Sequence, residues 1–161
     1  MLKRGFTLLE VLTAVVIVTI LVAIATPLYE KTIERSRLAE ARTVLSRLQE
    51  AKLYTMDNMG CTTYDPRDAK CPKLGHLNVS FASGVTDKYS FSTKDFSYSL
   101  SPSGSVNANG VCAKRLGNGD TAGTLFYYYG LSGEAAPVFA CSGESCEMYG
   151  FDSVKFGCNF D

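Results

Sequence analysis

The chain has 161 residues, with 16 basic and 16 acidic side chains, a formal net charge of zero, six cysteines and one histidine. This length accommodates a membrane segment and one domain of roughly 105 residues, and the balanced charge gives no whole-chain field directed at nucleic acid or a strongly acidic ligand. The sequence contains neither a Gly-x-Ser-x-Gly elbow nor a glycine-rich phosphate loop after a strand, so we predict no enzymatic activity and no cofactor.

The N-terminal residues 3–10, Lys-Arg-Gly-Phe-Thr-Leu-Leu-Glu, directly precede an uncharged and mostly apolar run at 11–29. A carboxylate at the edge of a membrane helix is unusual, because an ionised carboxylate inside such a helix costs roughly 2.5 to 3.5 kcal/mol and usually marks a function with a partner. Cleavage after Gly5 would make the amine of Phe6 that partner. The amine could then neutralise Glu10 in its own chain or in a neighbour, and pairing between neighbours would build a filament.

A basic leader that ends in glycine, followed by Phe-Thr-Leu-Leu-Glu and a long apolar segment, resembles the class III signal of type IV pilins and of type II secretion pseudopilins. In that family a membrane-embedded prepilin peptidase cuts after the glycine and N-methylates the new first residue. The resemblance implies that residues 1–5 are a cleaved leader, that Phe6 becomes the methylated N-terminus and that Glu10 is the fifth mature residue. It is tight over residues 3–29, and Pro27 falls where many major type IVa pilins carry a helix-interrupting proline.

Two plainer interpretations compete for the same segment. An ordinary secretory signal would use Lys3 and Arg4 as its positive end and residues 23–25, Ala-Ile-Ala, as its cleavage site, but the apolar run is long for such a signal and Glu10 interrupts its start. A plain single-span anchor explains the span and gives no reason for the motif. The basic leader predicts an inner-membrane precursor with its N-terminus in the cytoplasm and its C-terminal domain outside.

The pattern from Phe6 to about Tyr54 predicts one long helix with two different halves. Residues 6–29 are apolar almost all round and long enough to cross a bilayer or to form a filament core. Residues 30–56 are amphipathic, and we expect a stripe of Leu38, Ala41, Leu45 and Leu48 to face a sheet. The charged side chains on the other faces, Lys52 among them, are interpreted as a solvated surface.

Pro27 is expected to bend this helix, because it removes a backbone donor and clashes with the carbonyl of Ala23. The resemblance further implies that the helix partly melts at residues 19–28 when subunits assemble. A simple transmembrane proline kink predicts the bend without any filament.

Residues 57–161 are predicted to form an exported, β-rich globular domain. We expect a loop at 57–76, and the alternating or aromatic stretches at 77–81, 96–100, 111–114, 124–129 and 138–141 predict strands. Residues 101–104 and 117–120 read as turns between them. About four antiparallel strands packed on the amphipathic stripe give an α+β fold.

All six cysteines follow the apolar span, which places them on the exported side and indicates a disulfide framework. Six cysteines allow 15 connectivities, and the spacing favours Cys61 with Cys71 and Cys141 with Cys146, leaving Cys112 with Cys158. Zinc is disfavoured because His76 is the sole histidine. The segment 117–120, Gly-Asn-Gly-Asp, lacks the further acidic ligands of a calcium site. We therefore predict no metal.

The sequence as a whole predicts a structural subunit of a type IV pilus-like filament. Its partners would be further copies of itself in a helical homopolymer, the prepilin peptidase, the pilus assembly machinery and, before assembly, the cytoplasmic membrane. A pseudopilin of type II secretion is the nearest alternative. An alternative of another class is a minor subunit or anchored domain that binds DNA or a surface ligand, which a basic groove on the folded domain would favour.

Overall fold

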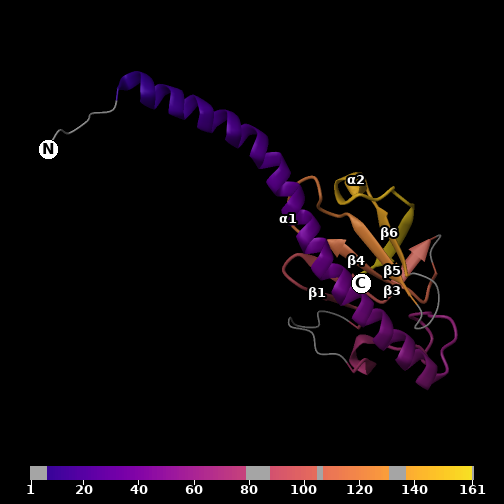
Figure 1. The fold of residues 1–161 in the computed structure, drawn as a ribbon. Helices are drawn as coiled ribbons and strands as arrows, with labels where there is room; N and C mark the ends of the chain where they lie inside the picture. Colours follow the sequence, from indigo (N-terminus) through magenta and orange to yellow (C-terminus); the bar gives the residue numbers. More distant parts are fainter. Residues whose placement is uncertain (1–6, 79–87, 105–106, 131–136, 161) are drawn as a thin grey trace. The chain divides into compact units, whose positions relative to one another are not determined.

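The structure is a computed structural model that describes residues 7–78, 88–104, 107–130 and 137–160. The chain divides into two compact units, Met1–Ser36 and Arg37–Asp161, and α1 (Leu8–Met59) contributes to both (Figure 1). The predicted long helix is therefore confirmed, and it continues five residues beyond the expected end at Tyr54.

Gly60 ends α1 through its left-handed backbone, with φ of 71°. The N–H of Cys61 donates to the carbonyl of Met56 at 2.9 Å, and the N–H of Gly60 donates to that of Asp57 at 3.2 Å. These two bonds form a Schellman motif, in which glycine adopts positive φ without the steric cost of a Cβ. The loop predicted at 57–76 is therefore wrong at both ends, because residues 57–59 belong to α1 and residues 74–76 form the 3-10 helix η1 (Leu74–His76).

The second unit contains a five-stranded antiparallel sheet with strand order β1-β2-β4-β5-β6 (Figure 1). Its strands are β1 (Ser90–Ser92), β2 (Phe96–Ser99), β4 (Val111–Arg115), β5 (Leu125–Tyr129) and β6 (Val138–Ser142). The last four match the stretches predicted at 96–100, 111–114, 124–129 and 138–141. Of the strand predicted at 77–81, residues 79–81 lie outside the described residues, and Leu77 and Asn78 are not in a strand.

The turn predicted at residues 101–104 is wrong, because these residues form β3 (Ser101–Gly104), which pairs antiparallel with β7 (Phe156–Asn159) in a separate two-stranded sheet. Proline, glycine and serine are typical of turns, but an edge position tolerates proline, which has no N–H to donate. The partner strand lies more than 50 positions away in the sequence, where Gly157 weakens the local β signal. The chain passes from the large sheet to the small one at Leu100, which is fully buried.

The hydrophobic core lies between the second half of α1 and the large sheet. The predicted stripe is buried as expected, with Leu38 7% exposed and its other three members 0% exposed. Aromatic side chains supply the sheet face: the Phe91 and Tyr98 rings stack at 4.9 Å, and Phe126 meets Phe96 edge to face at 6.1 Å. A short helix, α2 (Cys146–Tyr149), contributes the buried side chains of Cys146 and Tyr149 to this core. The α+β class is confirmed.

Three disulfides join the predicted pairs, two of which the spacing favours and one of which remains by elimination. Cys61–Cys71 closes the loop after α1, Cys141–Cys146 ties β6 to α2, and Cys112–Cys158 ties β4 to β7 and so connects the two sheets. No cysteine is free.

Candidate functional site

The N-terminal turn of α1 presents Glu10 three residues after its cap. Thr7 precedes the first helical residue, and its side-chain oxygen accepts the backbone N–H of Glu10 at 3.3 Å. Glu10 is exposed and is the acidic residue of the first turn, where the helix dipole favours a negative charge. Gly5 and Phe6 lie outside the described residues. The pairing of Glu10 with the Phe6 amine therefore stays a prediction.

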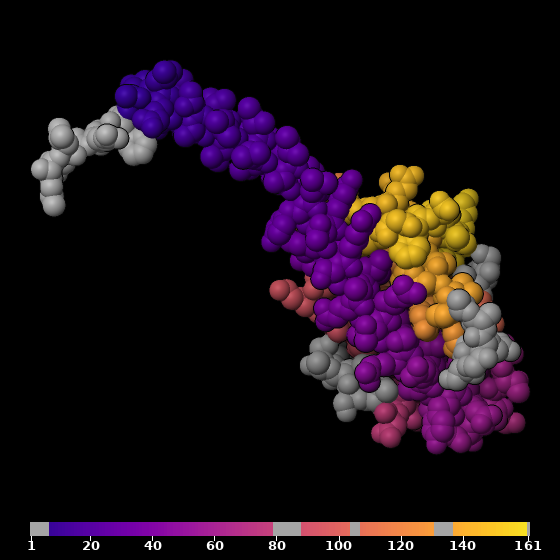
Figure 2. Space-filling view, viewed as in Figure 1, coloured from indigo at the N-terminus to yellow at the C-terminus, as the bar shows by residue number. Residues whose placement is uncertain are grey.

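Residues 8–29 of the first unit, which Figure 2 draws at the indigo end of the colour bar, expose an almost continuous apolar surface. From Leu8 to Tyr29 the large apolar side chains are each at least half exposed, ranging from 51% for Val11 to 85% for Leu8. Among the residues that the structure describes, α1 is the one helix long and apolar enough to cross a membrane, by length and composition. A contiguous apolar surface of this extent is unfavourable in water and marks a segment that meets lipid or other apolar surfaces.

Hydroxyl groups within the apolar segment are satisfied by the helix itself. Thr13 donates to the carbonyl of Glu10 at 3.0 Å, Thr19 to that of Val16 at 2.8 Å, and Thr26 to that of Val22 at 2.8 Å. Side-chain to backbone bonds of this kind let threonine reside in an environment without water.

Pro27 lies inside α1, and the helix runs through it without interruption. Proline cannot donate to the carbonyl of Ala23. A break at Pro27 in an assembled state stays a prediction.

A shallow hollow of about 350 Å³ runs along one face of the same segment, and Glu10 is one of the residues that line it. Among the described residues its lining is apolar apart from Glu10 and a threonine, and it includes the small side chain of Ala14. The lining residues are Glu10, Val11, Ala14, Val15, Val18 and Thr19. A face that combines one carboxylate with small and β-branched residues is suited to receive a second helix that brings a cation.

The interpretation of Lys52 as a solvated surface residue is wrong, because its side chain is 0% exposed. Its ammonium donates to the carbonyl oxygens of Leu100 at 2.7 Å, Ala108 at 3.0 Å and Gly110 at 2.5 Å, and it lies 3.8 Å from the centroid of the Tyr64 ring. Burial lowers the pKa of Lys52. The acceptors come from backbone 48 to 58 positions further along the chain, so helical periodicity offers no signal for them.

Further contacts make Lys52 part of a polar anchor, by which we mean Lys52, Gln49 and Asn109. The Gln49 amide donates to the carbonyl of Asn109 at 3.1 Å, and the Asn109 side chain accepts the N–H of Tyr64 at 2.7 Å and donates to the carbonyl of Thr62 at 3.1 Å. The anchor thereby joins α1, the loop before β4 and the Cys61–Cys71 loop. It satisfies backbone groups that the sheets leave unpaired.

The described residues contain no group of three or more His, Cys, Asp or Glu side chains that could hold a metal ion. The segment 117–120 is a turn with positive φ at Gly117 and Gly119, in agreement with the turn chemistry of its sequence.

Comparison with known proteins identifies the N-terminal segment. The family described as the prokaryotic N-terminal methylation motif matches residues 1–26. No curated protein and no solved structure matches the chain significantly. The matched residues include Gly5, Phe6 and Glu10, and they belong to a motif of structural subunits rather than of enzymes. The chain thus carries the prokaryotic N-terminal methylation motif, the class III prepilin signal of type IV pilins and pseudopilins.

Proposed function

We propose that this chain is the structural subunit of a type IV pilus-like filament. It is made as a single-pass inner-membrane precursor with its N-terminus inside, cleaved after Gly5 by a prepilin peptidase and N-methylated on Phe6. The assembly machinery then moves the apolar helix from the bilayer into a filament core of identical helices, and the disulfide-bonded unit faces outward as part of an extracellular fibre.

The observation that carries this proposal is the joint occurrence of the methylation motif at residues 1–26 with an exposed apolar helix whose first turn holds Glu10. Transfer from lipid to a helical core changes little hydrophobic free energy, because both surroundings are apolar. Polar pairing and close packing must then decide register. A free amine on Phe6 beside the Glu10 carboxylate of a neighbouring subunit provides the polar pairing, and the hollow lined by Ala14 provides room for the close packing.

Mass spectrometry of the mature protein tests the processing step directly. We expect a chain that begins at methylated Phe6. Gly5→Leu should leave the uncut precursor in the inner membrane, whereas the matched variant Ala25→Leu, which alters the competing signal-peptidase site, should be processed normally. A mature chain that starts at Thr26, or a block caused by Ala25→Leu alone, would contradict the proposal.

The motif is shared by pilins and pseudopilins, so processing alone does not distinguish them. Immunogold imaging of producing cells with antibody against residues 37–161 addresses this point. We expect labelled fibres that extend from the cell surface. Processed protein that stays in the envelope, together with loss of enzyme secretion when the gene is deleted, would instead assign the chain to a secretion system.

A further inference from the structure

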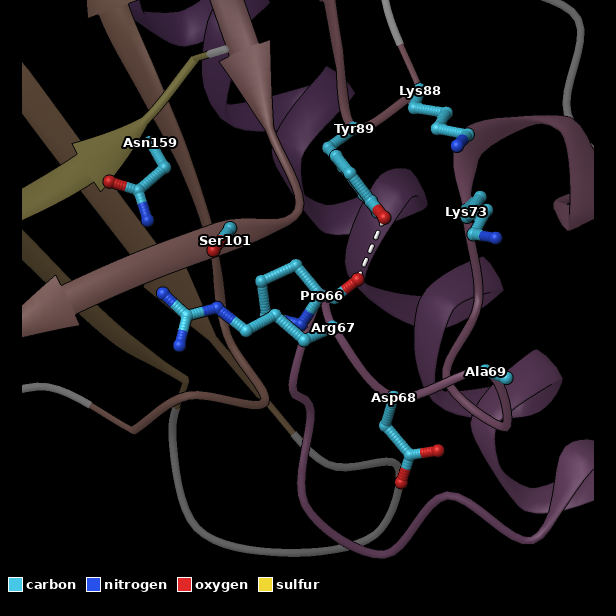
Figure 3. Close-up of a pocket in the computed structure, with 9 residues that line it drawn as sticks. All are labelled: Pro66, Arg67, Asp68, Ala69, Lys73, Lys88, Tyr89, Ser101 and Asn159. Carbon is cyan, nitrogen blue, oxygen red and sulfur yellow. Dashed lines mark hydrogen bonds between the residues drawn. The ribbon is translucent and has the colours of Figure 1, made fainter.

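A cleft of about 570 Å³ opens beside the Cys61–Cys71 loop (Figure 3). The Tyr89 hydroxyl donates to the carbonyl of Pro66 at 2.7 Å, a bond between two lining residues, and the N–H of Leu74 donates to the carbonyl of Lys88 at 2.9 Å. Cross-linking by the disulfide and these two bonds holds the walls in place. The volume lies within the range of small-molecule pockets, about 300 to 1,000 Å³.

Among the residues that the structure describes, the charged side chains that line the cleft are mostly basic. They are Arg67, Lys73 and Lys88, together with one acidic residue, Asp68. In Figure 3 the two lysines lie on one side of Tyr89, and the Arg67 guanidinium extends on the other. Cationic side chains on both sides of the Tyr89 ring favour an anionic ligand, and arginine suits a planar carboxylate or a sulfate in particular.

The remaining polar side chains of the lining can form hydrogen bonds with hydroxyl groups of a ligand. Ser101 and the Asn159 amide line the wall on the Arg67 side, and the Asp68 carboxylate can accept hydroxyl donors although it repels phosphates. Tyr89 is the one aromatic side chain among the described residues of the lining. Single-stranded nucleic acid sites instead combine a basic groove with several stacking rings.

We propose that this cleft binds an acidic saccharide, meaning sugar units that carry carboxylate or sulfate groups, on the exported unit. Acidic groups on the saccharide are bound by Arg67 on one side and by Lys73 and Lys88 on the other, and the sugar hydroxyls are bound by Ser101, Asn159 and Asp68. The site lies wholly within Arg37–Asp161 and does not depend on filament assembly.

Isothermal titration of the full-length processed chain in detergent micelles tests the proposal. The probes are a sulfated heparin tetrasaccharide, a tetragalacturonate, neutral maltotetraose and a short oligothymidylate. We expect at least one acidic saccharide to bind, with an affinity that falls as salt rises, and maltotetraose to give no binding. Arg67→Gln and Lys73→Gln should each weaken binding by about five- to tenfold, because each removes one charge-assisted contact.

The matched control is Lys70→Gln, since Lys70 is exposed in the same disulfide loop and does not line the cleft. It should change the affinity by less than about twofold. Three outcomes would overturn the proposal: binding of neither acidic saccharide, an equal loss with Lys70→Gln, or tighter binding of oligothymidylate that the same cleft variants abolish. Because subunits are dispersed in detergent, each of these outcomes leaves the filament proposal standing.

Discussion

Replacing Lys52 by methionine tests whether the polar anchor holds the loop before β4 against α1. Methionine keeps the length and apolar stem of the side chain but leaves the carbonyls of Leu100, Ala108 and Gly110 without this donor. A buried group that loses its partner costs about 1 to 3 kcal/mol, so three acceptors cost about 3 kcal/mol at the lower limit. Removal of a buried ammonium returns part of its desolvation cost. We expect a net loss of about 2 to 4 kcal/mol in the free energy of unfolding.

The assay is thermal unfolding of the oxidised full-length chain in detergent, followed by the near-ultraviolet circular dichroism of its tyrosines. A loss of about 3 kcal/mol lowers the Tm of a domain of this size by about 10 °C. The matched control is Lys94→Met, because Lys94 is exposed in the turn between β1 and β2. This control should change stability by less than about 0.5 kcal/mol.

The pH dependence of the free energy of unfolding gives a second, independent measure of what Lys52 contributes to stability. Burial lowers the pKa of Lys52 in the folded chain, whereas the unfolded chain titrates near the ordinary lysine value of about 10.4. Between these two pKa values the unfolded state binds more protons, so stability rises with pH. The difference in stability between wild type and Lys52→Met should therefore grow over that window. A variant as stable as wild type, or a difference that does not change with pH, would refute the anchor.

Three further predictions concern the folded unit. Gly110→Ala should destabilise it by about 1 to 3 kcal/mol in chemical denaturation, because an added Cβ would lie 2.2 Å from the Tyr127 ring, and an unchanged midpoint would contradict this contact. Joint replacement of Cys112 and Cys158 by serine should lower the free energy of unfolding by about 4 kcal/mol, whereas removing either local disulfide should lower it by about 2 to 3 kcal/mol. The reason is that the Cys112–Cys158 bond closes the longest loop, with a sequence separation of 46. The reverse order of Tm values would contradict this loop argument. Burial raises the pKa of Tyr98 and Tyr127 to about 12. The stability that their neutral hydroxyls contribute is therefore complete below a pH of about 10 and is lost as the pH rises from about 10 to about 12. Tyrosinate absorbance from these two residues below that range in the folded chain would contradict this prediction.

Features encoded by local periodicity could be predicted from the sequence. The apolar run and the stripe at Leu38, Ala41, Leu45 and Leu48 repeat at helical spacing, and β2 and β5 alternate or are rich in aromatic residues. Short loops between cysteines favoured two of the disulfides, and the third pair remained by elimination. In each case the signal lies within a few residues of the structure that it predicts.

Features that depend on distant partners could not be predicted in this way. β3 looks like a turn until it pairs with β7, and Lys52 looks like a surface residue until three loop carbonyls surround it. The basic cleft likewise gathers Arg67, Lys88 and Asn159 from three separate segments. A balanced net charge over the whole chain gives no indication of such a local group of basic side chains.

The central claim is that Glu10 pairs with the Phe6 amine of a neighbouring subunit, and the yield and length of filaments from Glu10→Gln cells test it most directly. Membrane insertion and the folded unit should stay intact, because a neutral amide is cheaper to hold in lipid than a charge. Assembly should nevertheless fall sharply, since a buried charge without its partner costs about 3 to 5 kcal/mol. Co-expressed wild type should partly restore it, because a mutant subunit still offers its own amine.

The matched variant Glu30→Gln makes the same change on an exposed carboxylate of α1 beyond the apolar run, and it should form filaments normally. Electron microscopy of both variants, with processing verified by mass spectrometry, gives the decisive comparison. The account predicts correctly cleaved Glu10→Gln subunits that form few or no filaments beside normal Glu30→Gln filaments. Glu10→Gln filaments of wild-type yield and length would contradict it.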